Sequence, residues 1–163
     1  MRYPALLRGM IAGMVGGLAG NISMGLVGAG IFNLLGWPAN TSFTIIGDSA
    51  AAFFSKLGIA LAGGVALGVG LYFLIGLLFG ASLGLAVGGI EPLRHLSGKK
   101  KVGLSILFVE VLSLPLLAAG SLALKMNAAS AGLWFSISFV MHLVYGLVLG
   151  LLLFIYTSKP YSS

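Results

Sequence analysis

The chain has 163 residues, of which 59% are hydrophobic and only 7% are charged. A water-soluble domain carries about 25% charged residues, so this composition excludes an ordinary soluble domain and indicates an integral membrane protein. The formal net charge is +6, and the basic residues that produce it lie beside and between apolar runs. We therefore expect these residues to contact the lipid bilayer, and we expect no nucleic acid as a partner. The chain has no cysteine, which excludes disulfides and thiolate metal sites.

Four apolar segments follow one another along the chain. Each is longer than the roughly 20 residues that a helix needs to cross the hydrocarbon core, and none has the alternating polarity of a barrel strand. The first is too long for the apolar core of a signal peptide, which has about 7–15 residues. We therefore predict an all-α integral membrane fold, a single domain over residues 1–163 that forms a four-transmembrane-helix bundle. The predicted spans are residues 9–35, 59–90, 102–124 and 134–156.

The connection between the first two spans carries a helix signal of its own. Asp48 is a typical N-cap residue, and it precedes a stretch with aromatic side chains, so we predict a short interfacial helix over residues 49–57. The first two spans are longer than the bilayer requires. We expect a break, if either helix has one, at Asn21 or at Gly63-Gly64.

Basic residues predict the orientation of the bundle. An even number of spans places both termini on one side, and most Lys and Arg residues fall on that side, so we predict that both termini are cytoplasmic. Within this set, Lys99, Lys100 and Lys101 form a run whose simplest role is to fix topology, and the alternative is contact with anionic lipid headgroups. The cytoplasmic set is Arg2, Arg8, Arg94, Lys99, Lys100, Lys101 and Lys159, against Lys56 and Lys125 on the other side.

Glycines recur at four-residue spacing in several spans. This spacing places them on one helix face, where two backbones can approach closely in lipid. We predict tightly packed, Gly-rich helices, either within the chain or, as the alternative, in a homo-oligomer or against other membrane subunits. The predicted packing residues are Gly76, Gly80, Gly84 and Gly88 in the second span and Gly146 and Gly150 in the fourth.

Polar side chains at membrane depth are the candidate functional residues. Titratable groups inside a span are rare and mark functional sites by default. Glu110 lies in the third span, His142 in the fourth, and Asn21 near the middle of the first. Helical spacing places each on a stripe of small and polar residues, and we expect the stripes to face one another. Antiparallel packing then places Tyr145 at a depth between those of His142 and Glu110, so that a polar chain from Asn21 through His142 and Tyr145 to Glu110 can form. The candidate set is Glu110, His142, Tyr145, Asn21, Ser113 and Ser138.

Two interpretations of this set stay open. The functional one is a polar path for protons or a small polar solute, since an acid and an imidazole can exchange protons. The structural one is that these groups bond to one another and hold the bundle together. Pro115, which lies shortly after Glu110, should kink the third span and suits a gate.

Metal and catalytic motifs are missing from the sequence. His142 is the one histidine within the predicted spans, and His95 lies in the basic loop. No Gly-x-Ser-x-Gly elbow, HExxH pair or Walker loop occurs. We therefore expect no metal ligand, no cofactor and no enzymatic activity.

The fourth span supplies a family resemblance. Its stretch from His142 through Tyr145 and Gly146 to Gly150 resembles the His-x-x-Tyr/Phe-Gly-x-x-x-Gly stretch of YagU-like small inner-membrane proteins of uncharacterised function. The resemblance implies a four-span protein of a bacterial or archaeal inner (plasma) membrane, and it supplies no activity.

Two function hypotheses follow from the sequence. The first is a small channel or transporter-like protein with an intramembrane polar path. The second is a non-transporting subunit or assembly factor that docks through its glycine faces onto a larger membrane complex.

Overall fold

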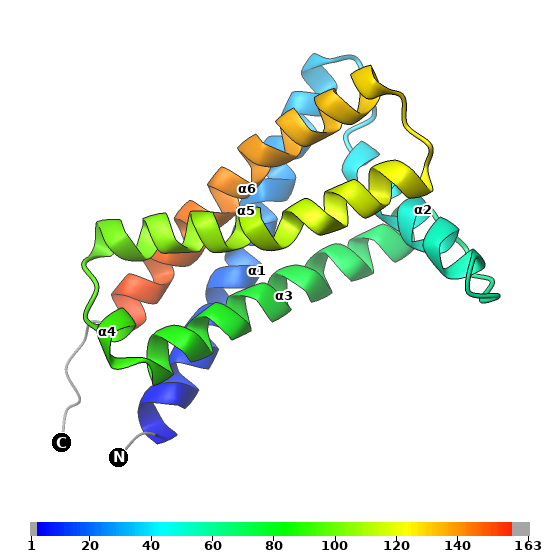
Figure 1. Ribbon diagram of the computed structural model, residues 1–163. Coiled ribbons are helices and arrows are strands. Elements are labelled where there is room, and N and C mark those ends of the chain that lie inside the picture. Colours follow the sequence, from blue (N-terminus) through cyan, green and yellow to red (C-terminus); the bar gives the residue numbers. More distant parts are fainter. Residues whose placement is uncertain (1–2, 158–163) are drawn as a thin grey trace.

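The structure is a computed structural model that describes residues 3–157 (Figure 1). Within that range the regular structure is entirely helical. Four long helices form a bundle, α2 lies at one end of it, and the single turn of α4 lies at the other end together with the start of α1 and the end of α6. The helices are α1 (Tyr3–Leu34), α2 (Thr41–Ser55), α3 (Val65–Gly89), α4 (Glu91–Arg94), α5 (Gly98–Ala123) and α6 (Ala128–Thr157).

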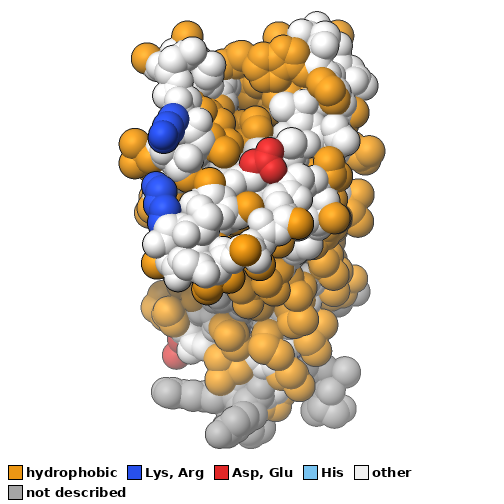
Figure 2. Space-filling view, turned by 90° about the vertical axis from the view of Figure 1, so that its right-hand side faces the viewer, with side chains coloured by type: hydrophobic (Ala, Val, Ile, Leu, Met, Phe, Trp, Pro, Cys, Tyr) orange, Lys and Arg blue, Asp and Glu red, His pale blue; other side chains and the backbone are white. Residues whose placement is uncertain are grey.

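The four long helices confirm the predicted helical membrane architecture. All four are long and apolar enough to cross a membrane. Hydrophobic side chains dominate the flank seen in Figure 2, where charged side chains are few. Each helix differs from its predicted span at the ends, most clearly at the starts of α1, α3 and α6. Two of the basic residues used to predict orientation, Arg2 and Lys159, lie outside the described residues.

The predicted interfacial helix and the start of the second span are both corrected. α2 begins at Thr41 rather than at residue 49, and Asn40 is its N-cap. Asp48 lies inside α2, where its Oδ1 atom accepts a hydrogen bond of 2.7 Å from the backbone N–H of Gly64. The second span begins at Val65 rather than at residue 59, because the preceding residues form a connection. α1 passes through Asn21 without a break.

α1 and α3 pack against each other backbone to backbone. An added Cβ atom at Gly13 would lie 2.9 Å from the Cα atom of Gly84, and one at Gly80 would lie 2.9 Å from the Cα atom of Gly17. Real Cβ atoms do not approach that closely. The glycine face of α3 is therefore covered by α1 of the same chain.

α5 and α6 pack in the same manner over half of their length. An added Cβ atom at Gly146 would lie 2.6 Å from the Cα atom of Ile106, and one at Gly150 would lie 2.5 Å from the Cα atom of Val102. These contacts lie toward the α4 end. Farther toward α2 the two helices separate (Figure 1).

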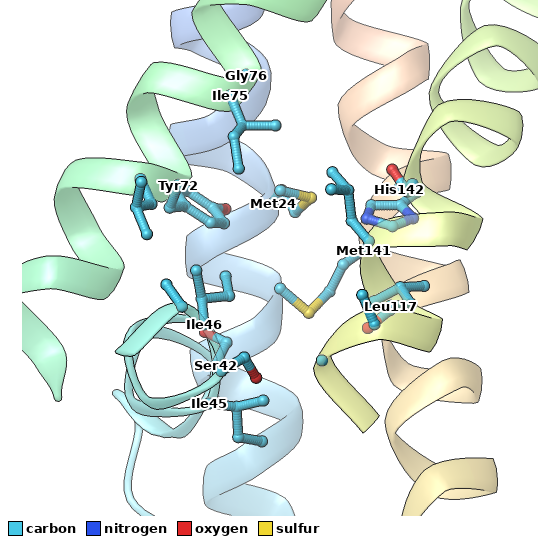
Figure 3. A pocket seen from close by; sticks show the side chains of 18 of the residues that line it. Met24, Ser42, Ile45, Ile46, Tyr72, Ile75, Gly76, Leu117, Met141 and His142 are labelled. Carbon is cyan, nitrogen blue, oxygen red and sulfur yellow. The ribbon is translucent and has the colours of Figure 1, made fainter. Parts of the chain in front are cut away.

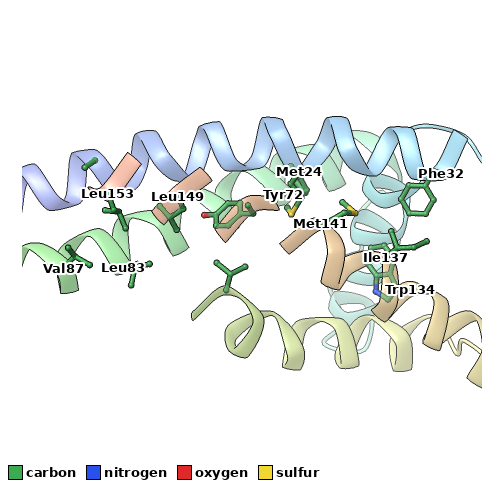
Figure 4. Packing of buried hydrophobic residues seen from close by; sticks show 13 residues of the cluster. Met24, Phe32, Tyr72, Leu83, Val87, Trp134, Ile137, Met141, Leu149 and Leu153 are labelled. Atoms are coloured by element: carbon green, nitrogen blue, oxygen red, sulfur yellow. The ribbon is translucent and has the colours of Figure 1, made fainter. Parts of the chain in front are cut away.

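Apolar side chains fill the half of the bundle nearer α4. Leu149 and Leu153 of α6 are 0% exposed, and Leu83 and Val87 of α3 are buried beside them (Figure 4). Because lipid tails are as apolar as leucine, this half is held by close packing rather than by exclusion of water. We call it the inner half, and the half nearer α2 the outer half.

Candidate intramembrane site

Glu110 of α5 and His142 of α6 meet at the boundary between the two halves. Their Oε2 and Nδ1 atoms are 3.5 Å apart, and the side chains are 16% and 13% exposed. The distance suits an ion pair when the imidazole is protonated, but neither Nδ1 of His142 nor Oε1 of Glu110 has a hydrogen-bond partner among the described residues. Both groups therefore keep unused hydrogen-bonding capacity.

Asn21 and Tyr72 form a two-way clasp between α1 and α3. The Nδ2 atom of Asn21 donates to the backbone carbonyl of Tyr72 at 3.0 Å, and the Tyr72 hydroxyl donates to the backbone carbonyl of Asn21 at 2.8 Å. The Asn21 amide fits here because Gly76 leaves its space: a Cβ atom at that position would collide with the amide. Only the Nδ2 atom of the Asn21 amide can donate to a carbonyl, so Oδ1 remains an acceptor. Oδ1 is buried and has no hydrogen-bond partner among the described residues.

The sequence suggests that Tyr145 links His142 to Glu110, and the structure shows no such link among the residues that it describes. The Tyr145 hydroxyl donates instead to the backbone carbonyl of Gly76 on α3, and the residue is buried. The polar residues therefore divide into two groups: Glu110 with His142, and Asn21 with Tyr72, Gly76 and Tyr145. Sequence analysis missed Tyr72, although a tyrosine hydroxyl at membrane depth is a signal that could have found it.

A cavity of about 400 Å³ lies beside both groups, in the outer half of the bundle (Figure 3). This volume falls within the usual range of small-molecule sites. In Figure 3, Tyr72 and His142 lie on opposite sides of the cavity, and Met24 and Met141 lie between them. Most of the lining is aliphatic or aromatic, and it includes Trp134 of α6 and Ile45 of α2.

The cavity exists because α5 and α6 diverge toward the α2 end of the bundle. Close contacts between α6 and α5 pair Gly150 with Val102 and Gly146 with Ile106. The last pair in this series is His142 with Glu110. One turn farther along, Ser138 of α6 and Ser113 of α5 line the cavity, and Leu117 lines it one turn beyond Ser113.

Several polar atoms face this cavity without a protein partner. Ser113 and Ser138 are buried and line the cavity, so their hydroxyls are available to it. Asn21 and Ser49 also line it, and each has a buried oxygen atom that lacks a partner. Buried polar groups are normally satisfied, so the unpartnered oxygen atoms of Asn21 and Ser49 indicate a place for polar atoms from outside the chain.

The remaining predicted residues occupy different surroundings. Lys99 and Lys100 are exposed, as contact with lipid headgroups requires. Lys101 is corrected: it is 1% exposed, its Nζ atom donates to Oγ1 of Thr157 at 2.8 Å, and it lies 5.7 Å from the ring centroid of Phe154. Its ammonium group therefore joins α5 to α6 and is not available to lipid headgroups. Pro115 lies inside α5, which continues through it.

The described residues contain no group of three or more His, Cys, Asp or Glu side chains that could hold a metal ion. The chain matches no protein-family model, no curated protein and no solved structure in the comparisons made with known proteins. The resemblance to YagU-like proteins therefore stays an expectation from the sequence. The coarse identity that the structure supports is an integral membrane protein with four candidate transmembrane helices.

Proposed function

We propose that this protein is a small transporter-like membrane protein that binds a small solute in its outer-half cavity and uses Glu110 and His142 as the titratable pair of the path. The observation that carries this proposal is the cavity itself, about 400 Å³ in volume and bordered by polar groups with no protein partner. A purely structural polar cluster would satisfy its own hydrogen bonds.

A transporter fits the geometry better than a continuously open channel. The cavity lies beside His142 but ends there, because the inner half beyond it is filled by Leu149 and Leu153, both 0% exposed. A solute could leave toward the α4 end only after these helices move apart. A site that is closed toward the α4 end is compatible with one state of an alternating-access cycle.

Glu110 occupies the position that a proton-exchanging group needs. It lies behind His142, which lines the cavity, and the two are within ion-pair distance. A proton accepted by His142 from the cavity side could therefore pass to Glu110 without crossing lipid. Intramembrane acid and imidazole groups are typical members of such relays.

The alternative, a subunit that docks through its glycine faces, has less support. The α3 face is covered by α1, and Gly146 and Gly150 are covered by α5. A homo-oligomer or a larger complex would have to use the lipid-facing flanks instead.

We also propose the orientation predicted from charge. The start of α1, the turn of α4 and the end of α6 lie at one end of the bundle. Arg8, Arg94, Lys99 and Lys100 belong to that end, which the positive-inside rule assigns to the cytoplasm. The resemblance to YagU-like proteins favours a bacterial or archaeal inner membrane.

Proton flux into proteoliposomes tests the proposed function. The purified protein is reconstituted around a trapped pH-sensitive dye, and flux is driven by an imposed gradient. We expect Glu110→Gln to lower the flux by about tenfold or more, whereas the control Glu91→Gln, which changes an exposed acid on α4, should leave it unchanged. Wild-type flux equal to that of protein-free vesicles, or flux insensitive to Glu110→Gln, would contradict the proposal.

A further inference from the structure

The wall of the cavity restricts the chemistry of what can bind there. Within residues 3–157, no Lys, Arg, Asp or Glu side chain lines it, and His142 is its one titratable group apart from tyrosines. A charged ligand would therefore lose its hydration without gaining a counter-ion at the wall. An uncharged ligand does not meet that cost.

The polar atoms of the wall are chiefly acceptors or hydroxyls. Oδ1 of Asn21 can only accept, because its Nδ2 atom is already used by Tyr72. The hydroxyls of Ser113 and Ser138 can donate or accept. A ligand that carries one hydroxyl group can bond to both kinds of atom, and the apolar lining suits a hydrocarbon body attached to it.

The mouth of the cavity lies on the flank of the bundle, between α3 and α5. Three of the lining residues are exposed: Phe53 of α2, and Leu116 and Ala119 of α5. Leu116 is about seven residues, or roughly 10 Å of helix, from the end of α5, and so lies at hydrocarbon depth. The rim is apolar and belongs to the surface that faces lipid.

Aromatic side chains limit this mouth at its inner end. Phe79 of α3 and Phe108 of α5 touch with ring centroids 6.1 Å apart, in an edge-to-face arrangement. Toward the outer end, α2 packs against both α3 and α5 and closes the space. The opening between these two closures therefore leads sideways into the bilayer.

We propose that the cavity binds an uncharged amphiphile, an apolar molecule with a hydroxyl head, that enters sideways from the bilayer between α3 and α5. The head lies among Asn21, Ser113 and Ser138, and the apolar body lies against Met24, Met141 and Trp134. This proposal rests on the proposed function, because it names the substrate class of the same cavity.

The chain offers a built-in reporter for this test. It contains two tryptophans: Trp134 lines the cavity, whereas Trp37 stacks on Phe32 beyond the end of α1. In the Trp37→Phe background, Trp134 fluorescence in phosphatidylcholine vesicles reports contact with a bromine atom. The probes are a terminally brominated hexanol, bromohexane, and a brominated hexyl-trimethylammonium ion, compared at equal concentrations in the membrane.

We expect saturable quenching by the alcohol, at about five- to tenfold lower concentration than by either other probe, the gain expected from one or two hydrogen bonds. The double change Ser113→Ala with Ser138→Ala should reduce this preference to less than about twofold. Ala119→Phe should narrow the mouth and weaken alcohol binding, whereas the neighbouring control Ala118→Phe should not, because Ala118 is exposed but does not line the cavity.

Equal and non-saturating quenching by all three probes, or a preference for the ammonium ion, would overturn the proposal. The wild-type probe comparison decides this even if Ala119→Phe fails to fold. Binding and flux separate the two proposals: flux that depends on Glu110 without alcohol preference overturns the ligand class alone. Alcohol preference without flux overturns the transport function and leaves the ligand class standing.

Discussion

The inner and outer halves of the bundle are built from the same four long helices but differ in how their space is filled. In the inner half, glycines on α3 and α6 let their neighbours approach to backbone contact, and leucines fill what remains. In the outer half, α5 leaves α6 and a cavity with unpartnered polar atoms takes the place of packing. The comparison shows that glycines determine where the helices pack closely, and that the polar groups lie where this close packing gives way to the cavity.

The largest expected effect comes from adding bulk to the inner half. Gly80→Leu places a side chain where even a Cβ atom would collide with α1, so we expect it to lower the free energy of unfolding by about 3 kcal/mol or more. At Gly70 on the same helix an added Cβ atom would meet nothing within 4 Å, so Gly70→Leu should change that free energy by less than about 1 kcal/mol. Unfolding in mixed detergent micelles measures the free energy of unfolding of both variants. Similar decreases for the two would disprove the claim that the inner half is closely packed.

A smaller effect is expected at the border between the halves. Asn21→Leu removes the side-chain half of the clasp, the hydrogen bond from Nδ2 of Asn21 to the backbone carbonyl of Tyr72, so we expect a loss of about 1–2 kcal/mol in unfolding free energy. Asn33→Leu, an exposed position on the same helix, is the control and should be nearly neutral. Equal stability of Asn21→Leu and Asn33→Leu would show that the clasp does not hold α1 to α3.

The smallest expected effect compares one serine from each half. Ser105→Val changes a residue that is 0% exposed, donates to the carbonyl of Lys101 and lies against Gly150, and we expect a loss of about 1 kcal/mol. Ser138→Val should be neutral to within about 0.5 kcal/mol, because its side chain faces open space in the cavity. Thermal unfolding in one detergent ranks the two, and the reverse order would contradict the assignment of the halves.

The fold was predictable from sequence where the signal was local. Long apolar runs predict four membrane helices without any knowledge of their partners. The ends of α2 were missed because Asp48, which resembles a local N-cap, bonds to Gly64 across a connection. That contact joins residues distant along the chain, and no spacing rule reveals it.

The candidate site was predictable only in part for the same reason. Helical spacing indicates which residues share a face, so Glu110 and His142 could be placed on stripes at similar depth. It does not reveal which helix lies opposite, and Tyr145 therefore bonds to Gly76 on α3 rather than joining the pair. The cavity depends on the separation of α5 from α6, which is a property of the whole bundle.

Thiol accessibility tests the central claim, an outer half that is hollow above a closed inner half, most directly. The chain has no cysteine, so Ser113→Cys and Ser105→Cys each introduce a single thiol on α5, both at buried positions. We expect an uncharged methanethiosulfonate to modify Ser113→Cys in vesicles about tenfold faster than Ser105→Cys, because only the first lines the cavity. Equal rates, or faster modification of Ser105→Cys, would contradict the account.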